Sequence, residues 1–241
     1  MEYFVSWRSS VQMRNFSTII TTAMQSNNQR ILHLSHNPLN ASAREPTISS
    51  TWQAPGHDWQ TEKFSAVCLI FAMELSKHLH QPFGMVETSV GGTPIHAWSS
   101  PAALHACPQQ KKKRALNEKR PSVLYNGMIA PILPMTIFGA IWYQGEADWA
   151  TPHLYACQFE AMISDWRAKF HQASKNQTSV MFPFGFVQLA PHRNVTGAHF
   201  GWPDIRWAQT GGYGYVPNPA LKTVFMAVAM DLPDYASPYG K

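Results

Sequence analysis

The pattern of apolar and polar positions along the chain predicts strands that alternate with helices. Apolar residues recur at three- and four-residue spacing over residues 61–75 and again over 153–171, which is typical of amphipathic helices. Short apolar runs predict strands at residues 30–34, 83–90, 135–143, 182–190 and 223–230. The last two runs are so continuously apolar that they favour a sheet covered on both faces. Together these elements predict a three-layer α/β fold with a parallel sheet.

The remaining segments add one helix and one long connection. Residues 9–24 are compatible with a helix, and residues 36–60 are rich in Asn, Pro, Ser and Thr, which indicates a connection on the surface. The sequence contains no internal repeat and no clear domain boundary. We therefore expect one domain over residues 1–241.

Two of the predicted strands end in polar turns that contain glycine. The strand at 135–143 runs into Gln144-Gly145-Glu146-Ala147-Asp148, and the strand at 83–90 runs into Gly91-Gly92-Thr93-Pro94. Ligands of open α/β sheets bind outside the carboxyl ends of the strands. Glycine pairs let backbone N–H groups approach a substrate, as an oxyanion hole requires. The pattern predicts an active site at this edge, with an ordinary polar turn as the alternative.

The charge distribution argues against nucleic acid as a partner. The net charge is +5, and the run from Lys111 to Arg120 holds six basic residues against Glu118, which accounts for the whole excess. A nucleic-acid-binding surface spreads its basic residues along a groove or face. We interpret this run as a solvated loop. No segment has the roughly 18 consecutive apolar residues of a membrane span.

The cysteines and glycosylation sequons bear on the compartment. Cys68, Cys107 and Cys157 lack metal-ligand spacing, so we expect no structural zinc. Cys68 lies in an apolar helical pattern and is predicted to be a buried thiol, whereas Cys107 and Cys157 are able to form one disulfide if the chain is secreted. Sequons begin at Asn15, Asn40, Asn176 and Asn194. Four sequons favour the secretory route, although residues 1–8 show no features of a signal peptide.

Several motifs in a fixed order carry a family resemblance. They are Gly91-Gly92-Thr93-Pro94-Ile95, Ile141-Trp142-Tyr143-Gln144-Gly145-Glu146, residues 182–189, Tyr215-Val216-Pro217-Asn218-Pro219 and residues 225–231. Over nearly the whole chain they resemble the sialate O-acetylesterase family of SGNH-type carbohydrate esterases. The resemblance implies a flavodoxin-like (SGNH hydrolase) sheet with helices on both faces. It also implies removal of O-acetyl groups from sialic acids by a serine, without metal or organic cofactor, in a lysosomal or extracellular setting.

The resemblance also implies roles for single residues. The segment Ser6-Trp7-Arg8-Ser9-Ser10-Val11-Gln12-Met13 resembles the family's nucleophile segment and places the nucleophile at Ser9. Trp7 and Arg8 stand where the family has Gly and Gln, and a helix N-cap is the alternative role for Ser9. The oxyanion hole would comprise the N–H groups of Ser9 and Gly92 and the side chain of Gln144.

Supporting roles and the general base complete the implied site. Gly91 and Glu146 are expected to support the loop or bind a sugar hydroxyl, and Asp231 to orient the base. The family's base is a histidine shortly after the strand that ends at Asp231, and the sequence stops at Lys241 before such a residue. We therefore expect an incomplete domain with little or no turnover. His96 is a substitute candidate, and a sugar-binding pseudoenzyme that retains the oxyanion-side pocket is the alternative function.

Overall fold

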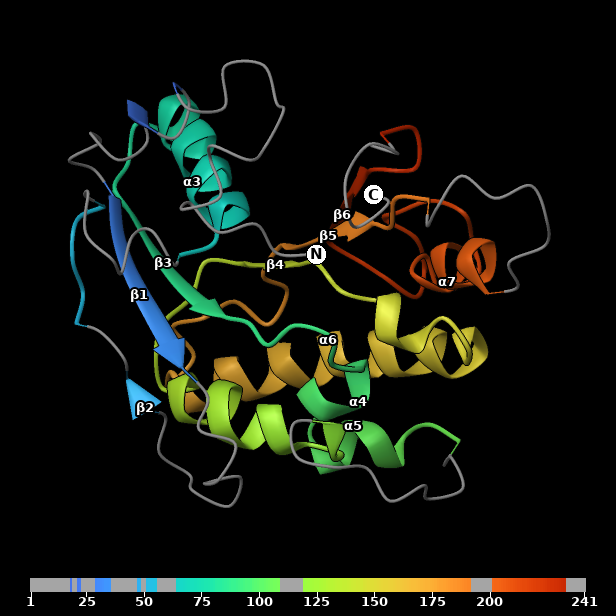
Figure 1. Ribbon diagram of the computed structural model, residues 1–241. Helices are drawn as coiled ribbons and strands as arrows, with labels where there is room; N and C mark the ends of the chain where they lie inside the picture. The colour runs from blue at the N-terminus through green and yellow to red at the C-terminus, as the bar shows by residue number, and fades with distance from the viewer. Residues whose placement is uncertain are drawn as a thin grey trace. The chain divides into compact units, whose positions relative to one another are not determined.

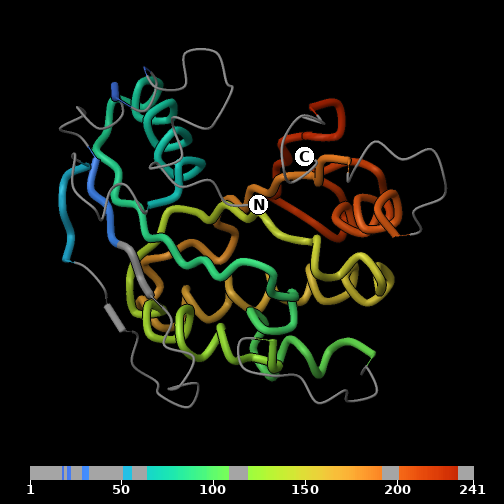
Figure 2. Tube along the Cα trace, in the orientation of Figure 1, coloured from blue at the N-terminus to red at the C-terminus, as the bar shows by residue number. Residues whose placement is uncertain are grey.

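The computed structural model describes residues 18, 21–22, 29–35, 47–48, 51–55, 64–108, 119–191 and 201–232. The chain divides into two compact units, which Figure 2 traces by residue number. The first unit comprises Met1–Asn37 and Glu45–Gly91, and the second comprises Pro38–Arg44 and Gly92–Lys241. Each unit contains a three-stranded sheet.

In the first unit, two parallel strands pack against one helix. Strand β1 (Gln29–Ser35) pairs with β3 (Phe83–Thr88), so that Gln29 lies opposite Phe83. Helix α3 (Ala66–Leu79) begins after Ser65, whose hydroxyl accepts a hydrogen bond from the backbone N–H of Cys68. The buried core of this unit lies between the helix and the strands and contains Ile31, Phe64, Leu69, Met73 and Met85. The predictions of these two strands and this helix are confirmed.

A buried glutamate connects the end of β3 with the start of α3. Glu87 Oε2 accepts a hydrogen bond from the Ser65 backbone N–H at 2.7 Å, and Oε1 accepts one from the Ser89 hydroxyl at 2.6 Å. Burial raises the pKa of the Glu87 carboxyl, and these two hydrogen bonds oppose the rise. The carboxyl group thus satisfies a backbone donor at the helix start.

In the second unit, three parallel strands lie in the order β4, β5, β6. They span Ala140–Trp142, Phe184–Gln188 and Val224–Val228. The α-helices are α4 (Ile95–Trp98), α5 (Pro101–His105), α6 (Pro152–Ala173) and α7 (Trp202–Ala208). The described residues of the unit also form the π-helix η4 (Tyr125–Ile129) and the 3-10 helices η5 (Ala130–Ile132) and η6 (Glu146–Asp148). Figure 1 shows the long helix α6 running alongside α4 and α5. Parallel strands joined through helices confirm the predicted α/β class.

An aromatic cluster forms the centre of the second unit. Trp142 of β4 makes edge-to-face contacts with Trp98 of α4 and Trp166 of α6, with ring centroids 6.0 and 5.8 Å apart. Phe159 of α6 contacts Phe184 and Phe186 of β5 in the same manner. Such pairs add about 0.5–1.5 kcal/mol each beyond the apolar area that they bury. The predicted apolar stripe of α6 is therefore the side that packs on the sheet.

Several boundaries differ from the sequence-based predictions. Strand β4 is shorter than the predicted 135–143, and Phe138, at 72% exposure, lies in the preceding irregular segment. In β6, Phe225 and Val228 are more than 40% exposed, so the prediction that this strand is covered on both faces is wrong. Strand β2 (Thr47–Ile48) pairs antiparallel with β1 inside the expected connection 36–60. Helix α7 was not predicted. The predicted helix 9–24 lies almost entirely outside the described residues.

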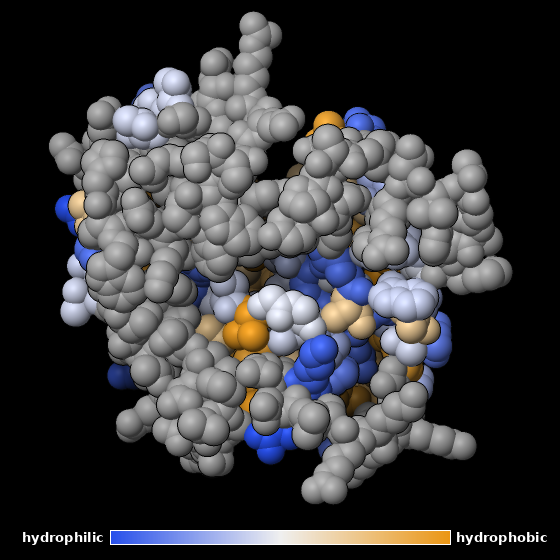
Figure 3. All heavy atoms as spheres, in the orientation of Figure 1, coloured by the Kyte–Doolittle hydropathy of each residue, from blue (hydrophilic) through white to orange (hydrophobic). Residues whose placement is uncertain are grey.

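On the face drawn in Figure 3, the coloured residues include hydrophilic ones, in blue, that lie beside hydrophobic ones, in orange. Within the described part of the chain, no helix combines the length and apolar character needed to cross a membrane.

One buried arginine connects α6 with the starts of β5 and β6. The Arg167 guanidinium donates to the carbonyl oxygen of Phe182 through Nε and Nη2, to that of Lys222 through Nη1 and to that of Thr223 through Nη2, at 2.8–3.1 Å. Burial lowers its pKa from the ordinary value. Arg167 therefore satisfies three backbone acceptors just before the two strands begin.

Replacement of Arg167 by methionine is expected to lower the free energy of unfolding by about 3 kcal/mol or more, because each buried carbonyl left without a donor costs about 1–3 kcal/mol. Urea denaturation at pH 7 measures the change. Lys175→Met, at an exposed position after α6, serves as the matched control and should stay near the parent value. Equal effects of the two substitutions would contradict the assigned role.

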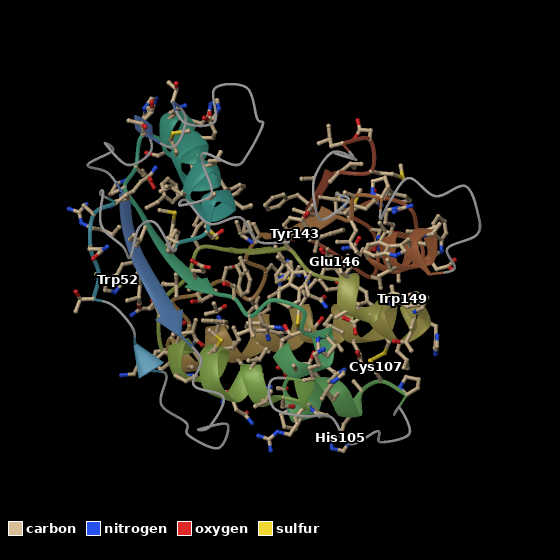
Figure 4. All side chains as sticks on the ribbon, viewed as in Figure 1. Trp52, His105, Cys107, Tyr143, Glu146 and Trp149 are labelled. Atoms are coloured by element: carbon tan, nitrogen blue, oxygen red, sulfur yellow. A yellow bond between two sulfur atoms is a disulfide. The ribbon has the colours of Figure 1, made fainter. Side chains whose placement is uncertain are left out.

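The second unit also contains a disulfide. Cys107, after α5, is bonded to Cys157 in α6 across 50 residues of sequence, as the cysteine pattern allowed. Figure 4 marks Cys107 beside the sulfur–sulfur bond. Cys68 lies in α3 outside this bond and is half-buried, less than the predicted full burial.

Joint replacement of Cys107 and Cys157 by serine is expected to lower the free energy of unfolding by about 2–4 kcal/mol, because the disulfide restricts the unfolded chain. Denaturation curves with and without dithiothreitol test this expectation. The reductant should destabilise the parent and Cys68→Ser equally and leave the double variant unchanged. A parent protein that is insensitive to the reductant would contradict it.

Candidate active site

Gln144 lies two residues beyond the carboxyl end of β4 and is only 9% exposed. Its Nε2 donates one hydrogen bond to the carbonyl oxygen of Thr93 at 3.1 Å and another to Oδ2 of Asp148 at 2.5 Å. Both partners are acceptors, so the –NH2 group of the amide must face them. The orientation of the Gln144 side chain is therefore set by its hydrogen bonds.

Asp148 ends the turn η6 and is 6% exposed. Besides Gln144, its Oδ2 accepts a hydrogen bond from the backbone N–H of Ile95 at 2.9 Å, at the first residue of α4. One carboxylate oxygen thus holds together the Gly92–Ile95 turn and the Gln144–Asp148 turn. The two glycine-bearing segments that the sequence singled out converge in the structure.

Burial raises the pKa of the Asp148 carboxyl, and the charge of Glu146 adds a smaller rise. The hydrogen bonds from Gln144 and Ile95 and the nearby His96 act in the opposite direction, but burial prevails. Asp148 is therefore harder to ionise than an exposed aspartate.

Glycine is required at two positions of these turns for conformational reasons. Gly92 has φ of 72° and Gly145 has φ of 138°, values that other residues rarely adopt. Apart from its chain neighbours, no atom of the described residues lies within 4 Å of the position that a Gly92 Cβ would take, whereas Leu189 Cδ1 lies 3.0 Å from the corresponding position at Gly145. The backbone at Gly92 is thus exposed to an incoming molecule, and the backbone at Gly145 is packed.

Gln209 holds the same region from the other side. It follows α7, is fully buried, and donates through Nε2 to the carbonyl oxygens of Gln144 at 3.2 Å and Val187 at 3.0 Å. Its Oε1 accepts from the Leu189 backbone N–H at 3.1 Å. Gln209 therefore joins the carboxyl ends of β4 and β5, a role that its sequence context did not indicate.

The other predicted site residues occupy separate places. Glu146 is half-buried in η6, between Tyr143 and Trp149 along the connection from β4 to α6 in Figure 4. Gly91 is exposed in the turn after β3 of the first unit, and Asp231 is exposed in the turn after β6. Among the described hydrogen bonds none joins Asp231 to Gln144 or Asp148. Ser9 lies outside the described residues.

His96, the substitute base candidate, is half-buried in α4. Its Nε2 lies 2.9 Å from the carbonyl oxygen of Lys119. That nitrogen is therefore engaged by the backbone in this arrangement. Within the described ranges, no group of three His, Cys, Asp or Glu side chains is placed to hold a metal ion.

Comparison with known proteins identifies the family. The model of the family described as "carbohydrate esterase, sialic acid-specific acetylesterase" matches residues 8–209. The chain belongs to this family. Sialate O-acetylesterase of Homo sapiens is 39% identical over 255 aligned residues, which cover 99% of this chain and 49% of the relative. The Rattus norvegicus protein is 42% identical over 232 residues, covering 80% of this chain and 42% of its own length.

A solved member of the esterase class shares the fold. The crystal structure of a carbohydrate acetylesterase from Xanthomonas citri aligns with a TM-score of 0.72 at 28% identity, over 97% of this chain and 48% of that one. The chain thus spans about half the length of the relatives that it matches. The family resemblance read from the motifs is confirmed.

Replacement of Asp148 by asparagine is expected to stabilise the protein at neutral pH relative to the parent. Because the pKa of Asp148 is higher in the folded than in the unfolded state, the parent loses stability as pH rises from the unfolded-state pKa through the folded-state pKa. A tenfold difference between the two acid dissociation constants corresponds to about 1.4 kcal/mol. Asparagine mimics the protonated form, so its advantage should vanish below the ordinary aspartate pKa.

The free energy of unfolding measured from pH 3 to pH 8 tests this sign. Glu160→Gln, at an exposed carboxyl on α6, is the control and should give no comparable trend. An advantage of Asp148→Asn that grows toward low pH would show that the carboxylate stabilises the fold through its charge.

Proposed function

We propose that this chain is a carbohydrate esterase that removes O-acetyl groups from sialic acids through a serine nucleophile. Family membership and the names of the relatives support the substrate class. The structural observation that carries the proposal is the fixed amide of Gln144 beside the Gly92–Thr93 turn, held at 3.1 and 2.5 Å by two acceptors. A rigid donor next to an accessible glycine backbone is the arrangement that stabilises an oxyanion.

The proposed reaction assigns Ser9 as the nucleophile. Its hydroxyl oxygen attacks the acetyl carbon, and the carbonyl oxygen becomes an oxyanion held by N–H groups of Ser9, Gly92 and Gln144. The bond between the acetyl carbon and the sugar oxygen then breaks, and the proton lost by the Ser9 hydroxyl passes to that sugar oxygen. Water cleaves the acetyl-enzyme ester into acetate and the free Ser9 hydroxyl. Each oxyanion donor in such sites contributes roughly a factor of 10²–10³ to kcat.

Gln144 is already hydrogen-bonded through both amide protons, so it must exchange one bond to serve as a donor. The bond to the neutral Thr93 carbonyl is the longer one, at 3.1 Å against 2.5 Å for Asp148. We assign the Thr93-facing proton to the oxyanion. The mechanism also needs a general base for Ser9, and we do not assign His96 to that role, because its Nε2 faces the Lys119 carbonyl oxygen.

We propose supporting roles for three further residues. Gly91 and Glu146 would support the turn or contact a sugar hydroxyl, and Asp231 would orient the base. We also propose a lysosomal or extracellular location, since the Cys107–Cys157 disulfide and the four sequons suit an oxidising compartment.

Turnover of an O-acetylated sialic acid and of a chromogenic acetyl ester tests the assignment. The parent is expected to turn over slowly, because no general base is assigned to Ser9. Ser9→Ala should abolish that turnover, and Gln144→Leu should lower kcat by about 10²–10³-fold. Gln172→Leu, at an exposed glutamine on α6, is the matched control and should keep parental activity.

Two other results would change the assignment. Turnover that survives Ser9→Ala would remove Ser9 from the mechanism. Saturable binding of the acetylated sugar without any turnover, observed by ligand NMR, would favour the sugar-binding pseudoenzyme over the esterase.

A further inference from the structure

We propose that Asp148 is a positioning residue that holds Gln144 by one amide proton and leaves the other for the acetyl oxygen. This inference rests on the proposed function and assigns Asp148 no contact with the substrate. It is an acceptor throughout, and no proton or covalent bond passes through it.

The side-chain amide of Gln144 is held from its N–H side alone. The Gln144 Oε1 atom is buried and accepts no hydrogen bond from the described part of the chain, whereas Nε2 makes both of the side-chain amide's hydrogen bonds. A flipped amide would place Oε1 against two acceptors, the Thr93 carbonyl and the Asp148 carboxylate. Without Asp148, a single neutral hydrogen bond at 3.1 Å would orient the amide.

The two hydrogen bonds of the Gln144 side-chain amide are unequal. The bond to Asp148 is short and has an ionisable acceptor, and such charge-assisted bonds are roughly twice as strong as neutral ones. The bond to Thr93 is the one that a developing oxyanion, itself a charged acceptor, can replace. Asp148 therefore keeps Gln144 in place while the second proton changes partner.

The same carboxylate oxygen of Asp148 also positions the glycine turn. Asp148 Oδ2 accepts from the Ile95 backbone N–H at 2.9 Å, three residues after Gly92. Trp98 Nε1 donates to the Thr93 hydroxyl at 2.9 Å and stabilises the turn between Gly92 and Ile95. The distance between the Gly92 and Gln144 donors thus depends on Asp148.

The charged groups around Asp148 come from three elements. His96 lies on α4, Glu146 lies in η6 with Asp148 itself, and the buried Tyr155 of α6 interacts electrostatically with the carboxylate. Protonation of Asp148 would weaken its bond to Gln144. Because burial raises the Asp148 pKa, this loss should appear as an acid limb of kcat at a pH above the ordinary aspartate range.

The test compares Asp148→Asn with Asp148→Leu in the chromogenic ester assay. Asparagine keeps an acceptor and should stay within about tenfold of the parental kcat, but without the Asp148 acid limb. Leucine should lower kcat by about 10²–10³-fold, with a much smaller change in KM, as expected when an oxyanion donor is displaced. Glu160→Gln is the control and should keep the parental pH profile.

A second readout is independent of turnover. The side-chain amide protons of Gln144, observed by ¹⁵N NMR, should be protected from solvent exchange in the parent and in Asp148→Asn, and should lose protection in Asp148→Leu. Unchanged protection in the leucine variant, or an acid limb that persists in the asparagine variant, would overturn the positioning role. If Asp148→Leu does not fold, the pH profile of Asp148→Asn decides.

The esterase function and the positioning role of Asp148 are overturned by different results. Absence of turnover in the parent protein, together with the expected NMR pattern, would overturn the esterase function and leave the placement of Gln144 by Asp148 supported. Normal turnover with an unchanged kcat in a folded Asp148→Leu variant would overturn this inference and leave the esterase function supported.

Discussion

A buried carboxylate with two donors organises the candidate site. Asp148 Oδ2 lies at the meeting point of the Ile95 backbone N–H and the Gln144 amide. A buried acid without partners is costly, and so are buried donors without acceptors. The turn before α4 and the turn after β4 therefore satisfy each other, and the position of Gly92 follows from that arrangement.

The first unit uses the same physical solution at another place. Glu87, near the end of β3, accepts the Ser65 N–H just before α3, as Asp148 accepts the Ile95 N–H at α4. The first N–H groups of a helix lack intrahelical acceptors, and an acid at this position supplies one. Arg167 does the converse in the second unit, because its guanidinium supplies donors to carbonyl groups just before β5 and β6. A buried cation thus lies at the amino ends of these strands, and a buried acid follows the carboxyl end of β4.

The sequence predicted the elements whose burial is periodic and missed those defined by a few contacts. Helices α3 and α6 carry long apolar stripes. The strands β3 and β4 belong to separate three-stranded sheets, and the glycine turns that follow them are joined instead by the hydrogen bonds of Asp148 and Gln144. Helix α7 has only seven residues with a proline in its first turn, which gives too few repeats for periodicity. Gln209 follows that helix, and a single polar residue in the sequence does not predict that both the oxygen and the nitrogen of its side-chain amide make hydrogen bonds. Asp148 belongs to the polar run that the sequence analysis singled out. Its partner Ile95, however, is an apolar residue that donates through its backbone N–H, and a pattern of side chains cannot predict such a contact.

The backbone and the side chain of Gln144 are fixed by different partners. Gln209 holds the Gln144 carbonyl oxygen, while Asp148 and Thr93 hold the side-chain amide. Donors that are oriented during folding need no reorganisation when charge develops on a substrate, and this preorganisation is the main source of oxyanion stabilisation. The burial of three polar side chains, Gln144, Asp148 and Gln209, opposes folding unless their hydrogen bonds are made. The hydrogen bonds that these side chains make around one turn, with Gln144 Oε1 left without a partner among the described residues, therefore favour a site built for a fixed donor over a solvated turn at the end of a strand.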